Sequence, residues 1–284
     1  MKILVTGSTG FIGNYVVEEL LRKKHEVIAS SANEDAAQKK AWYPKVIYRK
    51  LDFRELNFDT DYFNYFDRPD IAIHLAWEGL PRYKEKFHLE ENLPRHATFL
   101  TNLVQNGLKS LTVAGTCLEY GLQNGCLDED MAAQPVVPYA IAKNKLREVL
   151  QNLQGVYQFS MKWVRLFYMF GRGQNPNSLV SQLDKAIEAG DREFNMSRGD
   201  QTRDFLPVEK VADYLVRIAL QDSVNGIMNC CSNTPVTVKA FVENYLREHK
   251  KNIHLNLGYY PYLDYEPMHF WGDDKKLKTI TNNE

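Results

Sequence analysis

Tyr139 and Lys143 are the side chains whose types and spacing most clearly suggest chemistry. They lie four residues apart in Pro138-Tyr139-Ala140-Ile141-Ala142-Lys143, a segment whose apolar spacing continues as a helix. On one helix face, the lysine ammonium would favour the phenolate and lower the tyrosine pKa from about 10 toward the range of a general acid or base. Alone, such a pair is also typical of a solvated helix face.

Thr116 adds a hydroxyl that is predicted to lie at the same edge of the fold. It follows the apolar run Ser110–Ala114, which has the composition of a buried strand. Open α/β sheets bind their ligands at the carboxyl ends of parallel strands. Thr116 is therefore the third candidate catalytic residue, with an ordinary threonine at a strand end as the alternative.

A glycine-rich loop follows the first predicted strand, Lys2–Val5. It reads Thr6-Gly7-Ser8-Thr9-Gly10-Phe11-Ile12-Gly13 and opens into an amphipathic helix. Glycines at these places allow a tight turn, close approach to a pyrophosphate and close packing of helix on strand, and the helix N-terminus favours negative charge. The loop predicts a dinucleotide site with cofactor contacts from Gly7, Thr9, Gly10, Phe11, Ile12 and Gly13.

The residues after the second and third strands bear on which dinucleotide binds. Where an acidic residue would bind the ribose hydroxyls of NAD, the sequence has Ser30 and Ser31, followed by Asn33. These side chains could donate to a 2′-phosphate, so NADP is favoured over NAD. Asp52, with Phe53 beside it, is placed for the adenine edge, although a turn residue at a strand end is an equal interpretation of Asp52.

Short β-branched runs alternate with helical segments along the chain. The predicted strands are Lys2–Val5, Glu26–Ala29, Val46–Tyr48, Ile71–Leu75, Ser110–Ala114, Met161–Leu166 and Ile227–Cys230. This alternation is typical of βαβ units with right-handed crossovers. We predict an α/β fold, a Rossmann-type doubly wound parallel sheet with a smaller C-terminal substrate-binding lobe. The dinucleotide-binding domain covers 1–171 and 204–232, and the lobe covers 172–203 and 233–284.

Composition narrows the class of protein. The chain has 284 residues, 35 basic and 36 acidic side chains and a net charge of −1, which gives no general attraction for nucleic acid or an anionic membrane surface. The sequence has no apolar run of about 18 residues and no signal peptide before its first strand, so we expect a soluble cytoplasmic protein. Four irregularly spaced cysteines predict reduced thiols and no metal site.

Together these motifs resemble extended short-chain dehydrogenase/reductases of the NAD-dependent epimerase/dehydratase family, which act mostly on nucleotide-diphosphate sugars. The resemblance covers nearly the whole chain and rests on Thr6-Gly7-x-x-Gly10-x-x-Gly13, His74-Leu75-Ala76, Thr116 with Tyr120-Gly121, Tyr139-x-x-x-Lys143, Arg165-Leu166-Phe167 with Gly171, and Arg203-Asp204-Phe205. It implies that Tyr139 exchanges a proton with a sugar oxygen that Thr116 also contacts, while Lys143 holds the nicotinamide ribose. Leu75 and Ala76 are expected to add cofactor contacts.

The two residues after Thr116 narrow the range of reactions that the chain could catalyse. The 4,6-dehydratases of the family usually place Asp-Glu there, whereas this chain has Cys117 and Leu118, which cannot act as paired carboxylates. Cys117 is expected as a small buried residue beside the substrate. We predict an NADPH- or NADH-dependent reductase of a nucleotide-diphosphate 4-keto-6-deoxyhexose, with Tyr139 as general acid. The alternatives are a nucleotide-sugar 4-epimerase with tightly bound NAD and a non-catalytic dinucleotide sensor.

The same resemblance implies contacts to the nucleotide sugar. Arg203 matches the family arginine that meets the diphosphate. The other candidate substrate contacts are Arg172, Tyr168, Glu78 and Asn92. Relatives often dimerise through paired helices, here near Leu89–Gln105 and Tyr139–Leu153, so we expect a homodimer.

Overall fold

A parallel sheet of seven strands forms the centre of the computed structural model, which describes residues 1–282. The strands lie in the order β12-β7-β5-β4-β1-β2-β3, and every neighbouring pair is parallel. They are β1 (Lys2–Thr6), β2 (Glu26–Ser31), β3 (Ile47–Lys50), β4 (Ile71–His74), β5 (Ser110–Thr116), β7 (Ser160–Leu166) and β12 (Gly226–Cys230). The seven predicted runs are these seven strands, so the predicted Rossmann-type sheet is confirmed.

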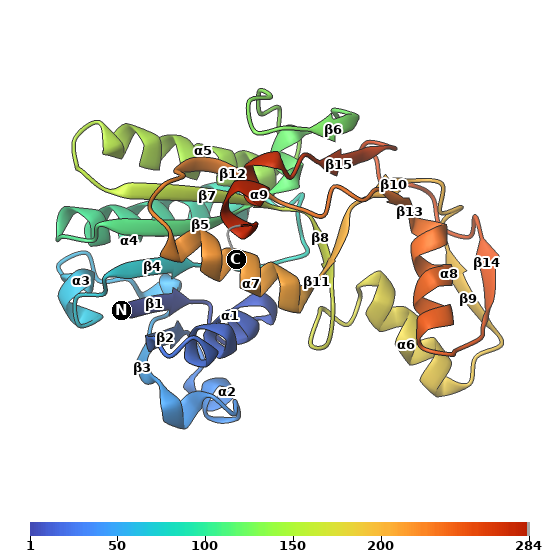
Figure 1. Cartoon of the computed structure of the whole chain (residues 1–284), viewed down its shortest axis with the longest axis horizontal. Coiled ribbons are helices and arrows are strands. Elements are labelled where there is room, and N and C mark those ends of the chain that lie inside the picture. The colour runs from blue at the N-terminus through green and yellow to red at the C-terminus, as the bar shows by residue number, and fades with distance from the viewer. Residues whose placement is uncertain (283–284) are drawn as a thin grey trace.

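Helices cover both faces of the sheet (Figure 1). On one face lie α1 (Phe11–Arg22), α7 (Val208–Leu220) and α9 (Lys275–Thr281). On the other face lie α3 (Tyr62–Tyr65), α4 (Leu93–Gln105) and α5 (Pro138–Gln154). The small helix α2 (Glu34–Gln38) follows β2.

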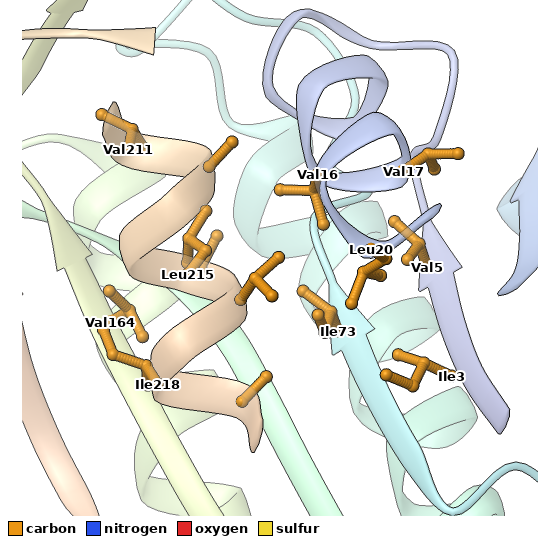
Figure 2. Packing of buried hydrophobic residues seen from close by; sticks show 14 of the residues in the cluster. Ile3, Val5, Val16, Val17, Leu20, Ile73, Val164, Val211, Leu215 and Ile218 are labelled. Carbon is orange, nitrogen blue, oxygen red and sulfur yellow. The ribbon is translucent and has the colours of Figure 1, made fainter. Parts of the chain in front are cut away.

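Strand alternation divides the core between these two faces. In β1, Ile3 and Val5 pack toward α1 and α7, whereas Leu4 packs toward the helices of the opposite face. Figure 2 shows the first of these layers, in which Leu20 of α1 and Leu215 of α7 lie over the strands. Because both faces are covered, the strands are apolar throughout, which explains why they stand out in the sequence.

A smaller lobe lies beside the carboxyl ends of the strands and has its own apolar core. It contains α6 (Leu179–Ala189), α8 (Val238–Glu248) and the parallel pair β9 (Glu193–Met196) and β14 (His254–Leu257) (Figure 1). Short strand pairs connect the lobe to the sheet domain: β8 (Tyr168–Phe170) with β11 (Phe205–Pro207), β10 (Thr202–Arg203) with β13 (Val236–Thr237), and β6 (Gly125–Leu127) with β15 (Phe270–Gly272).

The end of the chain departs from the predicted division into domains. Residues 233–284 were all assigned to the smaller lobe, but α9 packs on α7 and β12 of the sheet domain. Leu277 of α9 is buried in the core beneath α7 because the amphipathic helix finds its apolar partner there. The chain therefore crosses from the lobe back to the sheet domain after β14.

Three findings concern membrane-spanning helices, disulfides and metal sites. No helix within residues 1–282 is both long and apolar enough to cross a membrane. The four cysteines lie in the described part of the chain and form no disulfide. Over the same residues, no group of three or more His, Cys, Asp or Glu side chains is arranged to hold a metal ion.

Candidate active site

A cleft of about 400 Å³ opens at the carboxyl ends of the central strands. Its walls come from the glycine loop, the ends of β4, β5 and β7, the start of α5 and the segment after β14. The residues that line it are Gly7, Gly10, Phe11, Ile12, Gly13, Leu75, Trp77, Leu80, Pro81, Tyr83, Gly115, Thr116, Cys117, Leu118, Tyr139, Leu166, Phe167, Tyr168, Met169, Gln174, Asn175 and Glu266.

The glycine loop forms one end of the cleft and requires its glycines. Gly7 has a φ of +71°, and a Cβ on Gly13 would come within 2.1 Å of the Gly7 carbonyl oxygen. Gly10 is the N-cap of α1, no side chain caps the helix, and its first turn contains no acidic residue. The free N–H groups of α1 therefore face the cleft, which suits the pyrophosphate of a dinucleotide. The expected contact Thr9 is not among the described residues that line the cleft.

Thr116 ends β5 and is held by a hydrogen-bonded turn. Its hydroxyl accepts from the Leu118 N–H at 3.3 Å, while the Glu119 carboxylate accepts from the Thr116 N–H at 2.9 Å. Glu119 is fully buried and also accepts from the Trp163 indole and the Arg165 guanidinium, each at 3.0 Å. This reciprocal capping fixes the position of the Thr116 side chain at the edge of the cleft.

Tyr139 is the second residue of α5 and is 7% exposed. Burial raises the pKa of its phenol well above 10, and the neighbouring Tyr83, Glu119 and Cys117 raise it further, whereas the Thr116 hydroxyl acts in the opposite direction. The phenol pKa is therefore raised and not lowered as the spacing of Tyr139 and Lys143 predicted, because desolvation outweighs the other influences on the phenol. Tyr139 is thus protonated at neutral pH, the state that a proton donor needs.

Lys143 lies one helical turn after Tyr139 and is 2% exposed. Its ammonium donates to the Ala114 carbonyl oxygen at 2.9 Å and lies 4.1 Å from the centre of the Trp77 ring. Burial lowers the pKa of Lys143 to about 7, with Glu119 acting against that shift. The structure therefore places Thr116 and Tyr139 in the wall of the cleft, whereas Lys143 is not among the described residues that line it and lies behind the wall against Trp77.

Trp77 is held in place beneath Lys143 by two histidines. Its indole N–H donates to His88 Nδ1 at 3.1 Å, and its ring stacks on His96 with centres 4.7 Å apart. His88 Nε2 lies 3.0 Å from the Arg82 carbonyl oxygen, which assigns the ring proton to Nε2. Burial lowers the pKa of His88, so this ring is neutral and leaves Nδ1 free to accept.

The residues expected to bind the adenosine half of the cofactor do not line the cleft within the described chain. Ser30 pairs with Thr6 beside the glycine loop, and its carbonyl oxygen accepts from Ser8. The Ser31 hydroxyl lies 3.0 Å from the Tyr48 hydroxyl, and the Asn33 side chain caps α2. Of the groups expected to donate to a 2′-phosphate, the Ser31 hydroxyl is engaged locally, whereas Asn33 uses its side-chain oxygen and Ser30 its backbone carbonyl oxygen.

Asp52 and Phe53 are also committed to local structure. The Asp52 carboxylate caps the turn that follows and forms an ion pair of 2.5 Å with Arg54, which lowers the Asp52 pKa. Phe53 is buried against the rings of His96 and Phe99. The interpretation of Asp52 as a turn residue fits these contacts, and its cofactor role stays a prediction.

The fourth strand supplies one further wall of the cleft. Leu75 lines the cleft, whereas the Ala76 backbone lies so close to Gly7 that a Cβ on that glycine would come within 2.8 Å of the Ala76 nitrogen. His74 is buried beneath them, and its Nδ1 lies 2.8 Å from the Thr6 hydroxyl. The closeness of this contact and the positive φ require glycine at position 7.

The predicted substrate residues divide into two groups. Cys117 and Tyr168 line the cleft, and burial raises the pKa of both, so neither is ionised at neutral pH. Arg203 was expected to meet a diphosphate, but it is only 2% exposed and forms an ion pair of 3.0 Å with Glu266. Its other amino group donates to the Thr202 and Met268 carbonyl oxygens.

Glu78, Asn92 and Arg172 are not among the described residues that line the cleft. The Asn92 amide donates to the Glu78 carbonyl oxygen at 3.0 Å and so supports the loop after β4. Glu78 lies within 4.0 Å of two arginine side chains, Arg54 and Arg95. Arg172 is exposed, and its carbonyl oxygen accepts from Tyr15.

Sequence reasoning missed three residues of the site: Trp77, Glu119 and Glu266. A local signal existed for Glu119, because Thr116-x-x-Glu119 has the spacing of a capping box. Trp77 and Glu266 lie in irregular segments, and only the tertiary structure brings them to Lys143 and Arg203.

Comparisons with known proteins place this geometry in context. Residues 3–231 match the model of the NAD-dependent epimerase/dehydratase family. A protein named dTDP-6-deoxy-L-talose 4-dehydrogenase (NAD(+)), from Aggregatibacter actinomycetemcomitans, is 30% identical over 274 residues, which cover 96% of this chain and 99% of the relative. From the same organism, GDP-6-deoxy-D-talose 4-dehydrogenase is 26% identical over 296 residues, covering 100% of this chain and 92% of the relative.

The fold also matches solved structures. UDP-glucuronic acid 4-epimerase from Bacillus cereus, in complex with UDP-glucuronic acid and NAD, superposes with a TM-score of 0.84. The match covers 100% of this chain and 94% of that chain at 20% identity, so it is a likeness of fold.

Proposed function

The chain belongs to the NAD-dependent epimerase/dehydratase family, and from this premise we propose that it is an NAD(H)-dependent oxidoreductase that interconverts the C4 hydroxyl and the C4 ketone of a nucleotide-diphosphate 6-deoxyhexose. The observation that carries the proposal is that Thr116 and Tyr139 line one cleft with the uncapped start of α1, while Lys143 lies one helical turn after Tyr139. The names of two relatives that cover nearly the whole chain support oxidation and reduction at C4 of a 6-deoxy sugar.

The chain's own residues supply proton transfer and positioning. In the reducing direction, the protonated Tyr139 donates its proton to the C4 oxygen, and in the oxidising direction only the phenolate form of Tyr139 can accept that proton. Thr116, whose N–H donates to Glu119, would hydrogen-bond the same oxygen. The nicotinamide would supply or accept the hydride at C4, so that one hydride and one proton convert the ketone to the alcohol.

The cofactor is proposed to be NAD rather than the NADP favoured from the sequence. The name of the 30% identical relative specifies NAD(+), and the preference for NADP finds no support in the relatives. The local hydrogen bonds of the Ser31 hydroxyl point in the same direction, because they occupy a group that would meet a 2′-phosphate. Gly7, Gly10 and the first turn of α1 would hold the pyrophosphate, and Lys143 would hold the nicotinamide ribose.

Dehydration is not proposed because the residues beside Thr116 cannot carry it out. Cys117 and Leu118 are both buried in the cleft wall, and the Cys117 thiol is protonated. A 4-epimerase is the second candidate, supported by the likeness of fold to the Bacillus cereus enzyme. The homodimer through α4 and α5 and the cytoplasmic location stay predictions.

Turnover with matched substrates tests the proposal. Purified protein is incubated with NADH and 4-keto-6-deoxyhexoses linked to dTDP, GDP, CDP or UDP, and NADH absorbance is followed. We expect NADH consumption with at least one carrier and none in the Tyr139→Phe variant. Formation of a C4 epimer from an alcohol substrate, with no net change in NADH and stoichiometric NAD released on denaturation, would identify the epimerase instead. Binding of NAD without any turnover would favour the sensor.

A further inference from the structure

The ammonium group of Lys143 is buried with few hydrogen-bond partners. The side chain is 2% exposed, and within residues 1–282 its one hydrogen-bond acceptor is the Ala114 carbonyl oxygen, at 2.9 Å. An ammonium carries three N–H donors, and a buried charge that lacks partners costs free energy. A second favourable contact is therefore needed to keep the charged side chain at this place.

The ring of Trp77 supplies that contact. The Lys143 Nζ lies 4.1 Å from the centre of the ring, well within the distance at which an aromatic face attracts a cation. Tryptophan is the side chain that gives the strongest interaction of this kind. Trp77 also lines the cleft, whereas Lys143 is not among the described residues that do so. The ammonium is thus held against the inner side of a cleft-lining ring.

The other titratable groups around Lys143 do not replace this contact. The carboxylate of Glu119 favours the charged lysine, but it already accepts hydrogen bonds from an indole and a guanidinium. His74, His88 and His96 also act on Lys143 or are acted on by it, and burial lowers the pKa of each, so all three rings are neutral. The phenol one helical turn earlier is protonated and brings no negative charge.

Trp77 is held in one orientation by its neighbours. Its indole N–H donates to His88, and its ring stacks on His96. His88 begins a π-helical turn, His88–Asn92, which lies directly before α4. Turns of this kind are rare and are frequent at functional sites. The ring therefore presents a fixed surface to the ammonium.

We propose that Trp77 is a positioning residue for Lys143: the face of its ring holds the ammonium charged and in place one helical turn from Tyr139. The inference rests on the proposed function, in which Lys143 holds the nicotinamide ribose. With one N–H directed to Ala114 and the ring face beside the ammonium, an N–H donor remains for a ribose hydroxyl. An apolar side chain without a ring could fill the same space but could not attract the cation.

Two replacements of Trp77 separate the ring face from the filling of space. Trp77→Phe keeps a smaller ring, and Trp77→Met keeps an apolar chain without a ring, while both remove the indole and open the site to a similar extent. NMR titration of the free protein, with lysine labelled with carbon-13 at Cε and the Lys143 signal assigned by Lys143→Met, measures the Lys143 pKa. Because a ring favours the charged form, this pKa should be higher in Trp77→Phe than in Trp77→Met by about half a pH unit or more. Equal values in the two variants would overturn the proposal.

A second measurement keeps the shape of the side chain. Tryptophans with increasing numbers of ring fluorines, incorporated at position 77 alone, weaken the negative potential of the ring face while the ring stays in place. The pKa of Lys143 should fall with each added fluorine. A constant pKa along the series would also overturn the proposal, even if neither Trp77→Phe nor Trp77→Met folds.

Binding of NAD, measured by isothermal titration calorimetry, tests whether Trp77 acts through Lys143. Trp77→Met should bind NAD about tenfold more weakly than Trp77→Phe, because the ammonium is no longer held where the ribose would meet it. In the Lys143→Met background the same two replacements should differ by less than about twofold. A tenfold difference that persisted in this background would show that the ring contacts NAD directly, and the proposal would be wrong.

Tyr214 provides the matched control. Lys210 lies 4.8 Å from the centre of its ring on α7, and neither residue is among those described as lining the cleft. Tyr214→Phe and Tyr214→Met should therefore bind NAD with the wild-type Kd. If the wild-type protein binds no NAD, the proposed function itself fails, whereas the titration of Lys143 in the free protein still decides whether Trp77 holds it.

Discussion

Replacing Glu119 by glutamine should destabilise the protein strongly while leaving the shape of the side chain almost unchanged. The carboxylate accepts from Arg165, Trp163 and the Thr116 N–H, and Glu119 and Arg165 are 0% and 1% exposed. Glutamine removes the charge that compensates the buried guanidinium and turns one acceptor into a donor facing other donors. Breaking a buried ion pair from one side costs about 3–5 kcal/mol.

Thermal unfolding measures this loss. At about 2 °C per kcal/mol for a chain of this size, Glu119→Gln should lower Tm by roughly 6–10 °C. Glu148→Gln is the control, because its carboxylate is 53% exposed and lies 3.7 Å from Arg147. Removing such a surface pair should change Tm by about 1 °C or less. If the Tm of Glu119→Gln equalled the Tm of the control variant, our account of how Thr116 is held would be refuted.

Three further predictions concern the cleft. Tyr139→Phe should lower kcat by about 10²–10⁴-fold without changing Tm, because it removes only the hydroxyl group that transfers the proton. Steady-state kinetics and a melting curve measure the two quantities, and wild-type turnover in this variant would contradict the prediction. Folding lowers the pKa of Lys143 to about 7, so above that pH the unfolded chain binds more protons than the folded protein. The free energy of unfolding of the wild-type protein, relative to that of Lys143→Met, should therefore rise by about 1 kcal/mol per pH unit between pH 7 and 10. Urea denaturation at several pH values measures that difference, and a flat difference would refute the burial of an ionisable lysine. Gly13→Ala should abolish NAD binding measured by calorimetry and lower Tm, since its Cβ would come within 2.1 Å of the Gly7 carbonyl oxygen; wild-type affinity in this variant would contradict the loop geometry.

The sequence was sufficient for those parts of the fold that have a local signal. The strands of the sheet are apolar on both faces, so their runs were visible without knowledge of their neighbours. The positions of Thr116, Tyr139 and Lys143 followed from a strand end and one helix turn. The seven strands and the meeting of Thr116 with Tyr139 at one cleft were therefore predictable.

The remaining features depend on contacts between distant segments. Arg203 was expected to be free for a diphosphate because nothing near it in the sequence could pair with it, yet Glu266 comes from 63 residues further along the chain. Likewise, the effect of Lys143 on Tyr139 was predicted from their spacing, whereas the depth of burial decides the phenol pKa. Desolvation is a property of the whole fold and has no local pattern.

The separation of Glu266 from the proton-transfer residues has an evolutionary consequence. Thr116, Tyr139 and Lys143 belong to the sheet domain, whereas Glu266 lies in the irregular segment between β14 and β15 and lines the cleft. Point changes in that segment would reshape the wall of the cleft while the proton-transfer residues stay intact. New substrate ranges could thus arise by small steps, each of which leaves a working oxidoreductase.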